Sequence, residues 1–263
     1  MSETSPPDLA GATTTRAAFL VRAASGVLGA AAVASGVRGA APAETSPPGA
    51  RRKGKTDTNV KRWDVITIGN LSRNRYWGEG DGKGVRSVIC SCTLIQGDKF
   101  RLLVDPSLAD AAQMTRELDR RTGLKIADVT DVFVTHEHGD HFAGLAHFAA
   151  GARWLASPAV AEKLNRDGKL PARLEGVSGR LLDAVDVLAT PGHTPGHNSL
   201  RFDCDGLSVV VAGDAIATRD FFRERRPYYN AVDVEQSKRT MDAIADAADL
   251  IVPGHDNYFL SDR

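Results

Sequence analysis

The sequence has no excess of charge of either sign. Lysine and arginine together number 33, aspartate and glutamate also number 33, and the formal net charge is zero. Proteins that bind nucleic acid usually carry a basic excess, so we expect no stable nucleic-acid binding. No apolar run is long enough, and free enough of charge, to cross a bilayer, so we expect no transmembrane anchor in the mature chain.

Cysteine is also scarce, with only three residues. An odd number of this size is a poor basis for a disulfide framework. Cys90 and Cys92 lie two apart in a predicted strand, where small buried hydrophobic side chains are the favoured interpretation. The remaining composition, 42% hydrophobic and 25% charged, is ordinary for a globular protein with a sizeable core.

Residues 1–59 differ in composition from the rest. The stretch 16–22, with an arginine at each end, leads into an Ala/Gly/Val-rich run, and Ala41-Pro42-Ala43 offers small residues before a cut. This layout predicts an export signal over residues 1–43 and a flexible linker over 44–59. Residues 15–20 resemble a twin-arginine motif with Ala17 in place of the second arginine. We expect export from the cytoplasm; the alternative is an Ala-rich tail on a cytoplasmic protein.

Residues 60–263 carry alternating strand and helix signals in one domain. Hairpins stand beside crossover helices, which indicates a mixed α/β class. Predicted strands cover 65–68, 87–95, 100–104, 129–134, 154–156, 185–189, 199–204, 207–212 and 250–252, and predicted helices cover 108–121, 142–148, 158–166 and 234–248.

The densest concentration of reactive groups is the stretch 135–141, which reads Thr-His-Glu-His-Gly-Asp-His. In an extended chain His136 and His138 project to the same side, and Asp140 and His141 open the predicted helix that follows. Imidazole and carboxylate groups together suit zinc, iron, cobalt or manganese. A His-rich surface loop is the alternative, but three of the seven histidines fall within six positions here, which favours a metal site.

Three later residues extend this constellation. His193, Asp214 and His255 each follow a predicted strand, and each is preceded by a glycine. Glycine lets the backbone turn sharply and approach a site closely. Ligands placed on several strand ends gain a rigid geometry.

Together these residues resemble the signature of the metallo-β-lactamase superfamily, His-x-His-x-Asp-His followed by His, Asp and His. The resemblance implies a four-layer αββα sandwich and two divalent metal ions, with zinc favoured over iron or manganese. It also implies that Asp140 and Asp214 are catalytic and that Asp105 orients a ligand histidine. By position, one metal takes His136, His138 and His193, the other takes Asp140, His141 and His255, and Asp214 bridges them.

A bridging Asp214 beside His141 resembles the glyoxalase II and lactonase branch of the superfamily. That resemblance implies hydrolysis of an ester, lactone or amide-type bond in a small or medium substrate. Residues 213–218 are similar to lactonases, with Ala217 where those carry a tyrosine. Segments 140–148, 190–193 and 209–214 resemble an RNA-cleaving branch, so a phosphodiesterase is an alternative. A metal-stabilised binding module without turnover is another, and a redox role is a third. We expect no flavin.

Two segments are expected to contact the substrate, the loop 69–84 and the residues after Asp214. Aromatic side chains supply an apolar wall there, and arginine can hold a carboxylate or phosphate. The alternative is that the phenylalanines belong to the core and the arginines to a solvated helix end. We expect His147 to be structural and His197 not to be a ligand. The predicted substrate contacts are Tyr76, Trp77, Phe221, Arg223 and Tyr228.

Overall fold

The computed structural model describes residues 59–80 and 82–262. They belong to the second of two compact units, Arg52–Arg263. The export signal predicted over 1–43, and all of the predicted linker except its last residue, lie outside the described residues. Within the described ranges, no helix combines the length and the apolar character needed to cross a membrane.

The first sheet begins with an antiparallel hairpin and continues with parallel strands. β1 pairs with β2 and β2 with β3 in antiparallel fashion, whereas β3, β4, β5 and β6 run parallel. The carboxyl ends of these parallel strands therefore lie at one edge of the sheet. In spatial order the strands are β1 Val60–Thr67, β2 Cys92–Gly97, β3 Arg101–Val104, β4 Asp131–Val134, β5 Arg153–Ala156 and β6 Glu175–Gly176.

The second sheet is antiparallel except for one pair of strands. β10 and β11 run parallel, and their neighbours on both sides are antiparallel. The spatial order is β12 Phe259–Leu260, β11 Leu250–Pro253, β10 Leu207–Gly213, β9 Asn198–Cys204, β8 Val185–Ala189 and β7 Gly179–Leu181.

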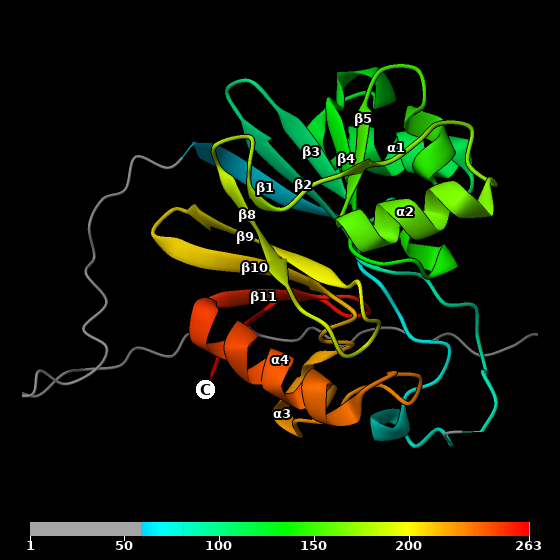
Figure 1. The fold of residues 1–263 in the computed structure, drawn as a ribbon, viewed down its shortest axis with the longest axis vertical. Helices are drawn as coiled ribbons and strands as arrows, with labels where there is room; N and C mark the ends of the chain where they lie inside the picture. The colour runs from blue at the N-terminus through cyan, green and yellow to red at the C-terminus, as the bar shows by residue number, and fades with distance from the viewer. Residues whose placement is uncertain (1–58, 81, 263) are drawn as a thin grey trace, which may run out of the picture. The chain divides into compact units, whose positions relative to one another are not determined.

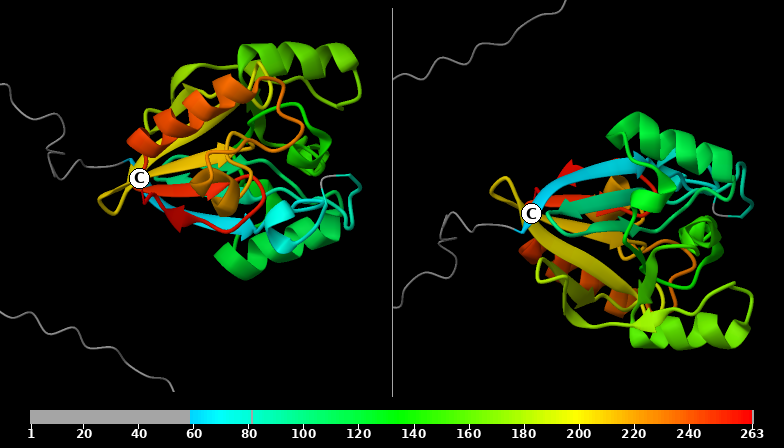
Figure 2. Two further views of the ribbon diagram at one scale, coloured as in Figure 1. Left: turned by 90° about the horizontal axis from the view of Figure 1, so that it is seen from below. Right: turned by 90° about the horizontal axis from the view of Figure 1, so that it is seen from above.

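Three apolar layers hold the sheets and helices together. One core packs the first sheet against α1 Ala111–Thr122 and α2 Pro158–Asp167. A second core fills the space between the two sheets, and a third packs β10 and β11 against α3 Arg219–Arg223 and α4 Val234–Ala247. The domain is thus the four-layer αββα sandwich implied by the sequence, with α1 and α2 on one side and α4 on the other (Figures 1 and 2).

Helix limits follow local capping signals. The side chain of Asp110 accepts a hydrogen bond from Gln113 N at the start of α1, and Gly123 ends that helix in a left-handed conformation. Ser157 and Asp233 act in the same way at the starts of α2 and α4. A side-chain oxygen at this position satisfies an N–H group that has no partner in the first turn.

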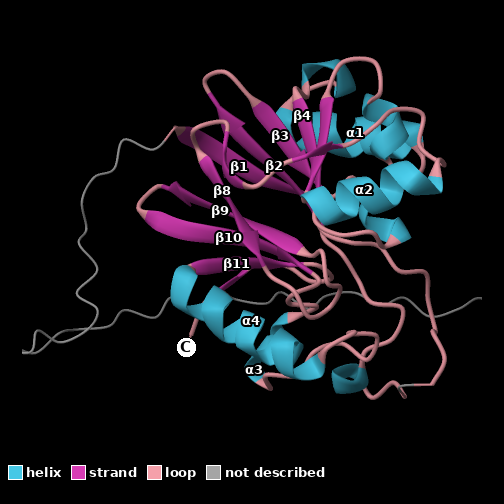
Figure 3. Cartoon of the chain, in the orientation of Figure 1, coloured by secondary structure: helices cyan, strands magenta, loops and turns pink. Residues whose placement is uncertain are grey.

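The helix predicted over 142–148 is wrong. In this range the chain instead forms the short 3₁₀ turn η4 Leu145–Phe148, which follows the 3₁₀ turn η3 Gly139–His141. Figure 3 shows the helices, strands and loops of the domain by colour. Gly144 N donates to Pro106 O, and a Cβ atom at Gly144 would lie 2.4 Å from Leu108 O. The N–H of Gly144 therefore binds the segment after β3 and not a carbonyl of a preceding helical turn. The strand predicted from 87 begins only at Cys92, and before it Ile89 forms an isolated bridge with Asn70.

Candidate metal centre

All seven predicted metal ligands lie just beyond strand ends, at one end of the sandwich. The stretch 136–141 follows β4, His193 follows β8, Asp214 follows β10, and His255 follows β11. The fold thus brings together residues that are up to 119 positions apart in the sequence, from His136 to His255. The potential ligand atoms of these residues form two groups, and within each group all of them lie within 4.8 Å of one another. The first group is His136, His138, His193 and Asp214, and the second is Asp140, His141 and His255.

The first group centres on His138. Its Nδ1 atom lies 3.0 Å from His136 Nε2 and 2.9 Å from His193 Nε2. The three rings approach edge to face, with centroids 4.7 to 4.8 Å apart. Three imidazole nitrogens converging on one point is the arrangement of a zinc-type site with three protein ligands.

The carboxylate of Asp214 lies between the two groups. Its Oδ2 atom is 3.3 Å from His193 Nε2 and 3.8 Å from His136 Nε2. Its Oδ1 atom is 3.1 Å from His141 Nε2 and 3.0 Å from His255 Nε2. Each oxygen therefore faces a different histidine group, which is the geometry of a carboxylate that bridges two cations.

Asp140 completes the second group. Its Oδ2 atom lies 3.6 Å from His255 Nε2 and 3.8 Å from His141 Nε2. Its side chain is 20% exposed, whereas the side chain of Asp214 is 5% exposed. Of the two predicted catalytic carboxylates, Asp140 is therefore the one with access to solvent.

The buried polar atoms at this centre fit divalent cations. Within the described part of the chain, Asp140 Oδ2 is buried without a hydrogen bond, and His141 Nε2 and Asp214 Oδ1, although 3.1 Å apart, form no hydrogen bond of normal geometry. Burying such atoms without partners is costly, and a bound cation would satisfy all three.

The pKa shifts differ between the histidines of the site. Burial lowers the pKa of His136 and brings the pKa of His193 to about 4, which favours the neutral imidazole that coordinates a metal. Burial acts in the same direction on His141 and His255, but nearby charged groups, Asp214 among them, outweigh it and raise the pKa of both rings. Burial raises the pKa of the Asp214 carboxyl, but the charges on His255 and His141 outweigh it and hold that pKa well below its usual range. An ionised carboxylate among imidazoles suits cation binding.

Neighbouring groups fix the orientation of two ligand rings. His141 Nδ1 lies 2.8 Å from Asp105 Oδ2, and Asp105 also accepts hydrogen bonds from Thr135 N and Thr135 Oγ1, each at 2.8 Å. His255 Nδ1 lies 3.0 Å from Ile89 O. A ring that donates through Nδ1 leaves Nε2 free to bind a metal.

Two buried residues near the centre, His197 and Cys90, make contacts that the sequence did not indicate. His197 Nδ1 lies 2.8 Å from Thr190 Oγ1, and its Nε2 accepts a hydrogen bond from Ala215 N, next to Asp214. Cys90 Sγ lies 3.2 Å from Asp140 O, and burial raises the pKa of its thiol to about 12, so the thiol stays neutral. The contacts of His197 with Ala215 and of Cys90 with Asp140 join different parts of the sequence. The only local pattern that could have indicated such a role is the repeated Pro-Gly-His of residues 191–197, which marks His197.

Gly254 allows β11 to deliver His255 beside Asp214. A Cβ atom at Gly254 would lie 2.1 Å from Asp214 Oδ1 and 3.0 Å from the backbone of Gly213. Any side chain at this position would therefore displace the Asp214 carboxylate.

The structure brings together three of the five predicted substrate contacts. The rings of Tyr76 and Phe221 lie 4.9 Å apart and those of Phe221 and Tyr228 lie 5.4 Å apart, in an apolar cluster with Leu71 and Ala217. Phe221 is buried, and the Tyr228 hydroxyl donates to a backbone carbonyl, Arg73 O, at 3.0 Å. These contacts favour a packing role for Phe221 and Tyr228.

The other two predicted contacts lie apart from this cluster. Trp77 is 51% exposed, with the guanidinium of Arg86 5.2 Å from its ring centroid. Arg223 forms an ion pair with Asp262 at 2.8 Å. Their role in substrate binding stays a prediction.

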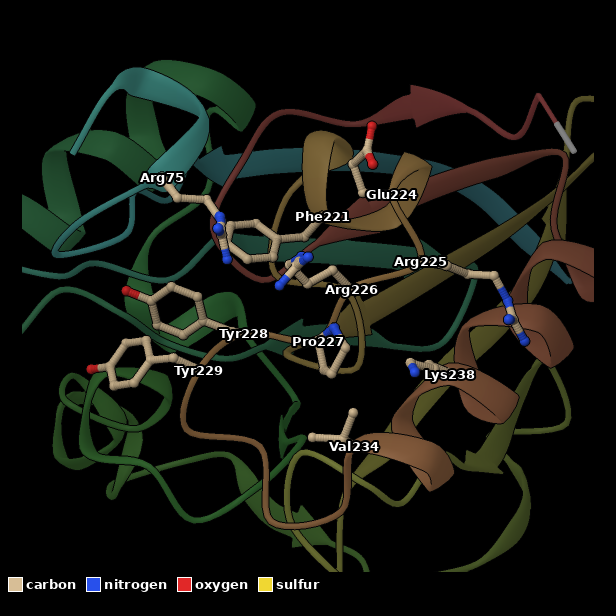
Figure 4. A pocket seen from close by; sticks show the side chains of 10 residues that line it. All are labelled: Arg75, Phe221, Glu224, Arg225, Arg226, Pro227, Tyr228, Tyr229, Val234 and Lys238. Carbon is tan, nitrogen blue, oxygen red and sulfur yellow. The ribbon is translucent and has the colours of Figure 1, made fainter. Parts of the chain in front are cut away.

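A cavity of about 460 Å³ adjoins the aromatic cluster, and no predicted metal ligand lines it. Arg75, Phe221, Tyr228 and Tyr229 lie on one side of it, and Arg225 and Lys238 lie on the other (Figure 4). Its walls are therefore both aromatic and basic.

With this fold and site, residues 85–255 match the model of the Metallo-beta-lactamase superfamily. The chain therefore belongs to this superfamily and is an enzyme of it. It is 33% identical over 175 residues to metallo-beta-lactamase domain-containing protein 1 of Xenopus laevis, covering 63% of this chain and 70% of the relative.

Other relatives share smaller or more divergent regions. The chain is 37% identical over 117 residues to the hydroxyacylglutathione hydrolase of Acidiphilium cryptum, a match that spans 43% of each protein. It is 23% identical to the N-acyl homoserine lactonase of Bacillus cereus over 73% of this chain and 85% of the relative. A solved quorum-quenching N-acyl homoserine lactone lactonase superposes with a TM-score of 0.60 at 21% identity, over 78% of this chain and all of the other. This last similarity shows a shared fold.

Proposed function

We propose that this protein is a dinuclear metal-dependent hydrolase that cleaves an ester, thioester, lactone or amide-type bond in a small or medium substrate. The observation that carries the proposal is the position of Asp214, whose two oxygens face different histidine groups at 3.0 to 3.8 Å. A structural zinc site needs only four closed ligands, whereas seven converge here.

Two divalent cations would occupy the two groups. His136, His138 and His193 would hold one, Asp140, His141 and His255 would hold the other, and Asp214 would contact both. When bound, paired cations lower the pKa of water to about 7 and stabilise a developing oxyanion. The donor set suits zinc and also tolerates iron or manganese.

Three aspartates of the chain would have further roles in the reaction. Asp214 would fix the separation of the two histidine groups, because its carboxylate is buried and held between them. Asp140 would orient the attacking water and move a proton to solvent, because its side chain is the more exposed of the two carboxylates. Asp105 would keep Nε2 of His141 directed at the centre.

The names of two relatives support an acyl substrate. Hydroxyacylglutathione hydrolase and N-acyl homoserine lactonase are both named for compounds with an acyl group. The apolar cluster of Tyr76, Phe221 and Tyr228 lies on segments that adjoin the ligand residues, since His255 N donates to Ala217 O. Packed in this way, the cluster would support the segments that adjoin the reacting bond, beside which an apolar substrate portion would lie.

Metal analysis and a substrate panel test the proposal together. Protein purified without chelator should carry two equivalents of metal per chain. Metal-loaded protein should hydrolyse thioesters, lactones or aryl esters faster than β-lactams, phosphodiesters or short RNA. One equivalent that does not rise on supplementation would contradict the dinuclear site, and turnover confined to phosphodiesters or RNA would contradict the bond class.

We also propose that the protein is exported, which the N-terminal composition supports. N-terminal sequencing of native protein should find a start after residue 43. An intact Met1 or Ser2 in a cytosolic fraction would contradict export.

A further inference from the structure

Arg73 is a buried arginine without an acidic partner among residues 59–80 and 82–262. Its residue exposure is 8%, its Nε atom is buried without a hydrogen-bond partner, and no ion pair involves it. By contrast, Arg86 pairs with Glu79 and Arg225 pairs with Asp242. Buried guanidinium groups are normally paired, so the isolation of Arg73 calls for a cause.

The main contact of this guanidinium is an aromatic ring. Its central carbon lies 3.7 Å from the centroid of the Tyr229 ring. A cation–π contact stabilises the charge, but it uses none of the five N–H donors in the plane of the guanidinium. Tyr229 is itself 54% exposed, so its ring has room to move when a ligand arrives.

Arg73 and Tyr229 join the two loops that adjoin the metal centre. The loop of Arg73 also contains Asn70, whose carbonyl oxygen lies 3.2 Å from His255 Nδ1. The loop of Tyr229 continues to Val232, whose N–H donates to His193 O at 3.1 Å. The loop of Arg73 therefore contacts a ligand of the second group, and the loop of Tyr229 contacts a ligand of the first group. Tyr229 also lines the aromatic and basic cavity (Figure 4).

We propose that Arg73 binds the anionic group, a carboxylate or a phosphate, of the substrate. Such an anion would pair with the Nε–H donor that has no partner and with a neighbouring Nη–H of the same guanidinium, in the two-point geometry that this group favours. Tyr229 would cover the apolar portion next to that anion. The substrate is then an acyl compound that carries a carboxylate or phosphate away from its scissile bond. This assignment of substrate class rests on the proposed hydrolase function, but anion binding by Arg73 does not.

A pair of matched esters tests the specificity. Phenyl acetate is neutral, and the phenyl monoester of succinate carries a carboxylate. In Arg73→Gln the ratio of kcat/KM for the anionic ester to that for the neutral ester should fall about ten- to hundredfold, mainly through KM. Arg225→Gln, at the cavity that Tyr229 lines and paired with Asp242, should leave the ratio unchanged. An unchanged ratio in Arg73→Gln would overturn the proposal.

Binding to the metal-loaded protein separates this proposal from the hydrolase function. Calorimetry with benzoate and phenyl phosphate should show affinity for at least one anion that Arg73→Gln loses and Arg73→Lys partly keeps. The preferred probe tells carboxylate from phosphate. Arg73-dependent binding without any ester turnover would remove the hydrolase function alone. Equal affinity in wild type and Arg73→Gln, with a lower Tm in the variant, would show that Arg73 is only structural.

Discussion

Among single residues, Asp214 has the most demanding position, because its two oxygens face two different sets of histidines. We predict that Asp214→Ala folds but loses metal and lowers kcat/KM by at least about a hundredfold, since a shared ligand should exceed the 10–100-fold effect of outer groups. Metal analysis, circular dichroism and ester turnover check this. Asp119→Ala, on the exposed face of α1, is the matched control. Metal content and turnover retained by Asp214→Ala would contradict the bridging role.

A second prediction for a single residue concerns Asp105, whose substitution should affect metal binding less than that of Asp214. It adopts a left-handed backbone conformation, with φ of 51°, which asparagine tolerates well. Asp105→Asn therefore keeps the backbone but weakens the hydrogen bond to His141 Nδ1. We predict about 10–100-fold weaker metal binding, as for other groups that orient a ligand histidine. Titration with a competing chelator measures this, and an unchanged affinity would show that His141 needs no such support.

At the scale of elements, strands and capped helices could largely be predicted from the sequence, and short elements could not. Long apolar runs indicated β4, β10 and β11, and Ser157-Pro158 indicated the start of α2. The strands β6, β7 and β12 have two or three residues, too few for a periodic pattern. The helix predicted over 142–148 failed because its apolar spacing does not reveal the contact between Gly144 and Leu108.

That contact yields a stability prediction for the η3–η4 segment. A Cβ atom at Gly144 would lie 2.4 Å from Leu108 O, a backbone atom that cannot rotate away. Gly144→Ala should therefore lower the free energy of unfolding by about 1–3 kcal/mol, as is typical of overpacking. Gly139→Ala, with no atom within 4 Å of the added carbon, should change it much less. Urea unfolding of both variants measures the difference, and equal stabilities would contradict the steric argument.

For the molecule as a whole, the ligand set could be predicted because it lies in short motifs at strand ends. The structure places all seven residues together, which is a finding about geometry and leaves their metal binding as a prediction. The isolation of Arg73 could not be foreseen, because it depends on the absence of a nearby acid in three dimensions. The contacts of His197 with Ala215 and of Cys90 with Asp140 likewise join loops from different parts of the chain.

The whole domain should depend on its cations for stability. Asp140, His141 and Asp214 hold buried polar atoms without a hydrogen bond of normal geometry, and a ligand that binds only the folded state stabilises it by mass action. At a free metal concentration of 100 times Kd this amounts to about 2.7 kcal/mol per site. For a domain of this size, we predict that zinc or manganese raises Tm by about 5–10 °C for each occupied site, or about 10–20 °C for both. A chelator should reverse the shift, and Asp214→Ala should show a smaller one. Calorimetry that finds the same Tm with chelator and with saturating metal would contradict cation binding at this centre.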